Sequence, residues 1–128
     1  MAAAALGRLR KRSEFLAVAA TNRRWTTPGL VLQAKKLPPS DEALSAEPPV
    51  RLGFTATKKI GGAVVRNRAK RRLRAAAREV LTGVEARPAD LVLVARQGTV
   101  ARPYLDLKAD LGAALGKLGI LAQGPDRS

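Results

Sequence analysis

Apolar and polar residues alternate with two different periods along the chain, and each period predicts its own elements. Residues 50–57 alternate apolar with polar side chains, which predicts a half-buried strand. Apolar runs within residues 30–37 and 89–96 predict two further strands, and the second run is apolar enough to be central in a sheet. A fourth, short edge strand is expected around Trp25.

Helical spacing predicts three helices. The first starts near Ser13, the expected N-cap, and stops near Asn22, which tolerates a left-handed backbone. The apolar seam of the second is formed by Val65, Ala69, Leu73, Ala76, Ala77 and Val80. The third spans residues 104–121, with leucines at 107, 111, 115 and 118. The order of these elements predicts an α+β domain in which helices cover one face of one sheet.

The remaining segments set the domain boundaries. A chain of 128 residues suits one domain with a single core, which we place at residues 13–121. Residues 1–12 are expected to form a basic N-terminal extension and residues 122–128 a flexible tail. Residues 38–49 carry four prolines and three acids, so we expect a polar loop between two strands.

The composition restricts the function more than the fold. Lys and Arg number 24 against 10 Asp and Glu, which gives a net charge of +14 and a pI near 11.6. A positive potential of this size favours polyanions as partners, with a membrane surface as a second candidate. The absence of Cys and His excludes disulfides, thiolate nucleophiles and zinc sites built from these residues. No apolar run approaches the ~18 residues of a membrane span, and we expect a cytoplasmic protein.

Much of the charge falls in the second helix. Residues 58–80 hold nine Lys and Arg, seven of them between Arg66 and Arg78, and a single acid, Glu79. Surface charge runs are usually solvated faces, but such faces mix the two signs at four-residue spacing. Here Lys70, Arg74 and Arg78 repeat one sign at that spacing, and six of the seven cations are Arg, whose planar fork matches phosphate oxygens. The pattern favours binding to a nucleic acid.

Three features of this helix refine the prediction. Gly61 and Gly62 precede it, so a phosphate could approach its first backbone amides closely. Asn67 and most of the cations face away from the apolar seam. Arg72 falls at the edge of the seam, and Arg66 points along it from the first turn.

Three alternative functions fit the charge less well. A ribosomal or assembly protein that only binds RNA explains the charge but not the particular run from Lys58 to Arg74. A DNA-binding helix in the major groove lacks a preceding helix at turn spacing and offers few base-reading side chains. A membrane-surface helix needs bulky apolar residues opposite its charges, whereas this helix has mostly Ala and Val there.

The run "KKIGGAVVRNRAKRRLR" resembles the signature of the bacterial ribonuclease P protein subunit, whose hallmark is an Arg-Asn-Arg core. "RLRKRSEFLAV", "RLGFTATKKIGGAVVRNR" and "DLVLVAR" resemble further parts of that family, so the similarity covers most of the chain. It implies a two-layer α-β-β-β-α-β-α fold with a mixed four-stranded sheet, like one class of ribosomal protein domain. It also implies a left-handed strand–helix–strand crossover, which is rare among proteins.

The resemblance implies a function without protein catalytic residues. In that family the RNA subunit, with bound Mg²⁺, removes the 5′ leader from precursor tRNA, and the protein binds the RNA subunit and the leader. The expected partners are therefore ribonuclease P RNA and precursor tRNA, with no DNA, no membrane and no protein-bound cofactor or metal. We expect the protein to be monomeric apart from the holoenzyme.

Site residues follow from the resemblance by position. Those expected to bind the RNA subunit are Lys58, Lys59, Gly61, Arg66, Asn67, Arg68, Lys70, Arg71 and Arg74. Those expected to extend the basic surface are Arg8, Arg10, Lys11 and Arg12. Those expected to line the leader cleft are Phe15, Leu30 and Gln33. Phe15 is equally consistent with core packing, because a cleft aromatic can do both.

The expected cleft departs from that of many relatives. Ala19 stands where a second aromatic is common, and Leu30 and Gln33 occupy strand positions that are often aromatic. The resemblance therefore implies a leader grip that is either weaker or relies more on hydrogen bonds and charge. Trp25 is expected to anchor the edge strand.

Overall fold

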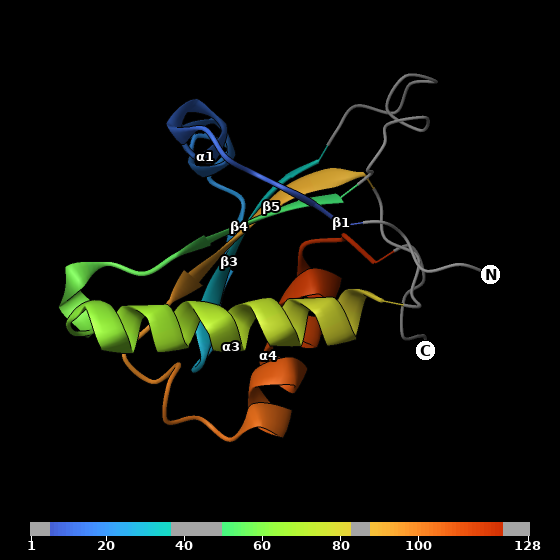
Figure 1. The fold of residues 1–128 in the computed structure, drawn as a ribbon. Coiled ribbons are helices and arrows are strands. Elements are labelled where there is room, and N and C mark those ends of the chain that lie inside the picture. The colour runs from blue at the N-terminus through green and yellow to red at the C-terminus, as the bar shows by residue number, and fades with distance from the viewer. Residues whose placement is uncertain (1–5, 37–49, 83–87, 122–128) are drawn as a thin grey trace.

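A five-stranded mixed sheet forms the centre of the fold (Figure 1). The computed structural model of the chain describes residues 6–36, 50–82 and 88–121. The strands are β1 (Leu6–Arg8), β2 (Arg24–Thr26), β3 (Leu30–Lys36), β4 (Val50–Thr55) and β5 (Ala89–Ala95), in the order β1-β4-β5-β3-β2. β4 runs parallel to β1 and β5, whereas β3 runs antiparallel to β5 and β2.

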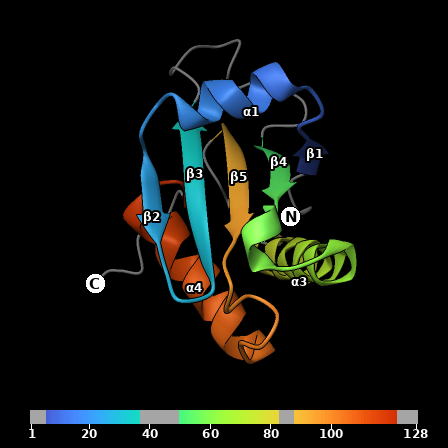
Figure 2. The same ribbon diagram turned by 90° about the vertical axis from the view of Figure 1, so that its left-hand side faces the viewer.

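In the described residues, three α-helices and one short 3₁₀ helix pack around this sheet. They are α1 (Arg12–Ala19), η1 (Lys58–Ile60), α3 (Ala63–Leu81) and α4 (Tyr104–Lys117). α3 and α4 lie on one face of the sheet, and α1 crosses the other face (Figure 2). α3 connects the neighbouring parallel strands β4 and β5.

The core is divided by the sheet because alternate strand residues point to opposite faces. Leu91 and Leu93 of β5 join the main core under α3 and α4, whereas Val92 joins a smaller cluster with Leu9 and Val18 beneath α1. All residues of β5 except Val94 are buried. This burial on both faces confirms that residues 89–95 form a central strand.

Three fold predictions need correction. The sheet has five strands rather than four, because residues 6–8, expected to be part of an extension, pair with β4. The fold has more than two layers, because α1 covers part of the second face. The N-cap of α1 is Lys11 rather than Ser13, while Asn22 does adopt the predicted left-handed conformation, with φ 58°. The polar loop at 38–49 and the tail at 122–128 lie outside the described residues.

Candidate nucleic-acid interface

A turn formed by Gly61 and Gly62 precedes the basic helix α3. Gly61 has φ 140°, a conformation that L-residues rarely adopt, and a Cβ there would lie 3.0 Å from that of Val65. Gly62 is the N-cap of α3, and no side chain of the described residues forms a capping hydrogen bond there. Val65, expected in the apolar seam, is 38% exposed because the first turn of α3 extends past the core. The buried part of the seam consists of Ala69, Leu73, Ala76, Ala77 and Leu81. The predicted seam residue Val80 is half-buried and packs against this core.

The outer face of α3 carries most of the cations predicted from the sequence. Asn67, Arg68 and Arg71 are exposed, and Lys70 and Arg74 are half-buried. Within residues 6–36, 50–82 and 88–121, no carboxylate lies within ion-pairing distance of Arg68, Lys70 or Arg71. Asn67, Lys70, Arg71, Arg74 and Val64 line a shallow depression of about 470 Å³ on this face. The face therefore presents a concentrated and uncompensated positive charge.

Arg72 and Arg66 lie in environments that differ from the exposed outer face of α3. Arg72 donates hydrogen bonds to the backbone carbonyl oxygens of Thr99, at 3.1 Å, and of Arg102. Its role is to hold the segment between β5 and α4 against α3. Arg66 is half-buried, and within the described chain its buried Nε has no hydrogen-bond partner. Both observations agree with their expected positions at the seam rather than on the outer face.

The two lysines before the glycine turn lie beside the start of α3. Lys58 and Lys59 begin η1, and both are exposed. The side-chain amide of Gln97 donates a hydrogen bond to the backbone oxygen of Lys59 at 3.3 Å, which links η1 to the turn after β5. The chain therefore places two further cations at the N-terminal end of the basic helix.

The N-terminal basic residues divide between the two faces of the sheet. Arg8 is in β1, where it pairs with Leu52, so its side chain points toward α3. Arg10, Lys11 and Arg12 are exposed around the start of α1, which lies on the opposite face. The predicted basic surface is therefore two separate surfaces.

Glu14 and Arg51 fix α1 on the sheet. The carboxylate of Glu14 accepts hydrogen bonds from the backbone N–H groups of Lys11, at 2.9 Å, and Arg10, at 2.8 Å, and these lower the pKa of Glu14 to about 2. Arg51 donates to Glu14 at 2.9 Å and makes two bonds to buried Asp90, at 2.9 and 2.8 Å. The bonds to Asp90 raise the pKa of Arg51. The network ties the first turn of α1 to β4 and β5.

The sheet face next to α1 carries two of the three predicted cleft residues. Phe15 is half-buried on Leu9, Val18 and Val92. A Cβ on Gly53 would lie 2.5 Å from the Phe15 ring, so the missing side chain in β4 makes room for the aromatic. Gln33 is half-buried on β3, and its alternation with the buried residues places it on the same face of the sheet.

Leu30 does not belong to this face. It is fully buried in the main core under α3 and α4, so its assignment to the cleft is wrong. Leu30 and Gln33 are three residues apart on one strand, and an odd spacing places their side chains on opposite faces. The neighbouring Val31 lies on the α1 side and is half-buried.

Sequence reasoning also left out two residues beside the basic helix. Phe54 of β4 lies under the Arg74 guanidinium, which is 5.3 Å from the ring centroid. Arg78 lies one helical turn further on, and it lines a second hollow, beside β1, together with Phe54 and Arg74. The four-residue spacing of Lys70, Arg74 and Arg78 was the available signal for Arg78. The strand alternation placed Phe54 with the core and gave no signal for its contact with Arg74.

Metal-binding clusters and membrane-spanning helices are both absent from the described residues. Residues 6–36, 50–82 and 88–121 hold no cluster of three or more His, Cys, Asp or Glu side chains that could bind a metal ion. None of the described helices is long and apolar enough to cross a membrane. The exposed cations on the outer face of α3 suit phosphate groups.

The chain is similar to known protein components of ribonuclease P. The Ribonuclease P family matches residues 4–119. The chain is 46% identical to the ribonuclease P protein component of Paramagnetospirillum magneticum, over 97% of this chain and 95% of that protein. It is 49% identical to the same component of Gluconacetobacter diazotrophicus, over 88% of this chain and 91% of that protein.

Solved structures agree in fold. The RNase P protein of Staphylococcus aureus superposes with a TM-score of 0.69 at 22% identity, covering 89% of this chain and 96% of that one. The family match, the two relatives and this solved structure each cover most of the chain. The chain therefore belongs to the family of ribonuclease P protein components, the protein subunits of a tRNA-processing endoribonuclease that has a catalytic RNA.

Proposed function

We propose that the outer face of α3 binds the RNA subunit of ribonuclease P. The observation that carries this proposal is the uncompensated charge of Arg68, Lys70 and Arg71, none of which has an acidic partner among the described residues. Arginine forks suit phosphate oxygens, and release of counterions from the RNA backbone drives such binding. Lys58, Lys59 and the first amides of α3 would border the same contact.

We further propose that the sheet face next to α1 binds the 5′ leader of precursor tRNA. Phe15 offers a half-buried aromatic ring beside β4, and Gln33 offers a half-buried side-chain amide on β3. Arg10, Lys11 and Arg12 at the start of α1 add positive charge to this side of the molecule. A single-stranded leader needs these two elements, an aromatic side chain for stacking and cations along its backbone.

Cleavage itself is assigned to the RNA subunit and its Mg²⁺. The described part of the protein has no cluster of three or more carboxylates that could hold a metal ion. The contribution of the protein is electrostatic: it lowers the repulsion between two polyanions, the RNA subunit and the precursor tRNA. Its effect should therefore be greatest where Mg²⁺ is scarce.

Cleavage of a 5′-labelled precursor tRNA at low Mg²⁺ tests this function. Three mixtures are compared: the protein alone, a bacterial ribonuclease P RNA alone, and both together. We expect cleavage only in the combined mixture, and Arg68→Ala should weaken it. Tight RNA binding without stimulation would leave a plain RNA-binding protein, and cleavage by the protein alone would reveal an active site in the protein.

Three finer properties are part of the same proposal. We expect a cytoplasmic protein, because precursor tRNA is processed there, and a monomer outside the holoenzyme, which light scattering can measure. The connection from β4 through α3 to β5 is expected to have the left-handed sense of the family.

A further inference from the structure

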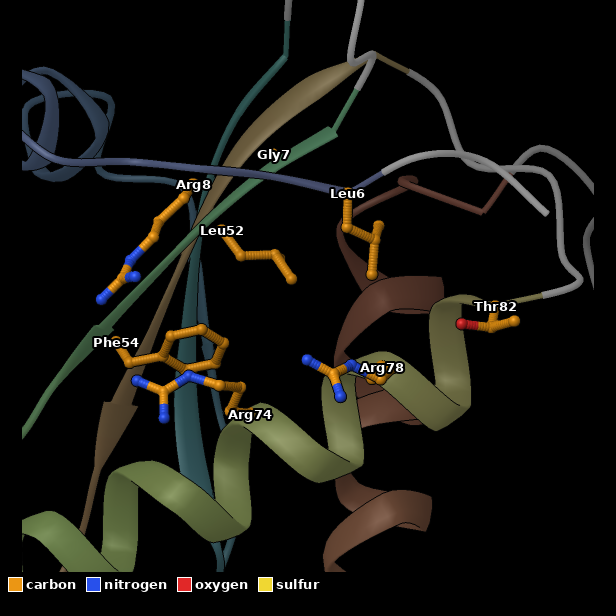
Figure 3. Close-up of a pocket in the computed structure, with 8 residues that line it drawn as sticks. All are labelled: Leu6, Gly7, Arg8, Leu52, Phe54, Arg74, Arg78 and Thr82. Carbon is orange, nitrogen blue, oxygen red and sulfur yellow. The ribbon is translucent and has the colours of Figure 1, made fainter.

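A groove separates the edge strand β1 from the second half of α3 (Figure 3). It has a volume of about 430 Å³, within the ~300–1,000 Å³ range of small-ligand sites. Leu52 and Phe54 of β4 form its floor, and residues 6–8 form one side. It lies on the α3 side of the sheet, whereas Phe15 lies on the α1 side. The groove is therefore separate from the surface proposed for the leader.

The walls of the groove are basic. Arg74 and Arg78 are four residues apart on α3, so they lie on the same side of the helix and face β1, and Thr82, the C-cap of α3, lines the groove beyond them. Arg8 faces them from β1, and Figure 3 shows the three guanidinium groups extending into the space between the strand and the helix.

These three cations serve no structural ion pair in the described parts of the chain. By contrast, Arg51 forms an ion pair with Asp90, and Arg102 forms one with Asp110. No such carboxylate among residues 6–36, 50–82 and 88–121 pairs with the arginines of the groove. Three unneutralised guanidinium groups around one hollow favour an anionic occupant.

The floor adds a stacking surface to this charge. Phe54 is half-buried, and the Arg74 guanidinium lies 5.3 Å from its ring centroid. Nucleobases stack on both aromatic rings and guanidinium planes. We propose that the groove binds one unpaired nucleotide, with its base on the Phe54–Arg74 pair and its phosphate between Arg8 and Arg78.

The nucleotide belongs to the RNA subunit rather than to the leader. Arg74 lines both the groove and the depression on the outer face of α3, so an RNA strand lying along that face continues into the groove. The leader surface lies across the sheet from it. This inference rests on the proposed function, since it requires the RNA subunit to lie along α3.

Site-specific crosslinking in the holoenzyme tests the location. The chain has no native Cys, so single-cysteine variants can carry an azidophenacyl group at one position. Arg78→Cys probes the groove, Asn67→Cys the outer face of α3, and Ala113→Cys an exposed position on α4 as a control. Each is assembled with ribonuclease P RNA and precursor tRNA, irradiated, and mapped by primer extension.

The expected result is a crosslink from Arg78→Cys to an unpaired nucleotide of the RNA subunit, distinct from the one reached by Asn67→Cys. A crosslink to the leader or to the body of the tRNA would overturn the proposed occupant. A crosslink from Asn67→Cys but none from Arg78→Cys would overturn the groove and leave the function of α3 intact. Failure of both positions would overturn the function and the groove together.

A second pair of variants tests the stacking surface. Phe54→Leu keeps an apolar floor but removes the ring, and it should weaken binding of the RNA subunit about five- to a hundred-fold. Trp25→Leu removes another half-exposed aromatic, on the opposite edge of the sheet, and should leave that affinity unchanged. Both are measured below their melting temperatures. Unchanged binding by Phe54→Leu, or equal losses in the two variants, would overturn the stacking contact.

Discussion

Arg71 and Arg72 are adjacent in sequence, yet the structure gives them opposite roles. Arg71 is exposed on the outer face of α3, and no residue in the described ranges accepts a hydrogen bond from it. Arg72 turns inward and donates to the carbonyl oxygens of Thr99 and Arg102. Replacing each by Gln removes the same charge and leaves a side chain suited to a helix. The two variants therefore separate RNA binding from stability.

The expected effect of Arg71→Gln is on the salt dependence of binding. Each phosphate contact contributes about 0.7–0.9 to the slope of log K against log salt concentration. If Arg71→Gln loses one contact, its affinity relative to the parent chain is lowest at low salt. The ratio of parent to variant affinity should be about threefold smaller at 200 mM salt than at 50 mM. Filter binding of ribonuclease P RNA across this range measures the slope, and the urea midpoint of the variant should equal that of the parent chain.

The expected effect of Arg72→Gln is on folding. Two hydrogen bonds from a charged, half-buried donor are lost, and the free energy of unfolding should fall by about 1–3 kcal/mol. Urea denaturation measures this change, and the salt slope should move by less than half of the change in Arg71→Gln. An unchanged slope in Arg71→Gln, or reversed roles of the two variants, would refute the assignment of the helix faces.

Three further substitutions test other parts of the structure. Leu73→Ala removes a fully buried side chain and should lower the free energy of unfolding by about 2–5 kcal/mol, while RNA affinity of the folded protein stays the same; an unchanged urea midpoint would contradict its burial. Phe15→Leu should reduce holoenzyme affinity for precursor tRNA about fivefold or more but leave that for leaderless tRNA unchanged, and an equal loss for both would mean that Phe15 only packs the core. Because the pKa of Glu14 is lowered to about 2 in the folded state, its bonds stabilise the protein above the ordinary value of 4.5 and are lost as the pH falls toward 2. Glu14→Gln should therefore flatten the stability profile between pH 4.5 and 2, and a profile parallel to that of the parent would show that the hydrogen bonds to Glu14 do not matter.

The elements that could be predicted from the sequence are those whose own periodicity decides their structure. The basic helix, the central strand at 89–95 and the half-buried strand at 50–55 follow from repeats that are complete within one segment. β1 could not be predicted this way, because three residues with a glycine in the middle carry no period. It becomes a strand only because β4 offers a free edge, which is a tertiary effect.

The candidate site was predictable to a similar degree. Helical spacing separates Arg68 and Arg71 from the seam, and the structure agrees. Leu30 was misplaced although strand alternation alone sets it opposite Gln33. The meeting of Phe54 with Arg74 depends on the distance between a strand and a helix, which no local pattern contains.

The sheet order has a consequence for the order of folding. β5 lies between β3 and β4, which do not pair with each other, so the three long strands can join only after residues 89–95 have been synthesised. These pairings are far apart in sequence, as for Leu32 and Leu93, and such contacts form slowly. The basic helix is made before the strand that completes its core. A nascent chain ending before β5 would therefore be an unfolded polycation on the ribosome, itself a large RNA, until β5 emerges.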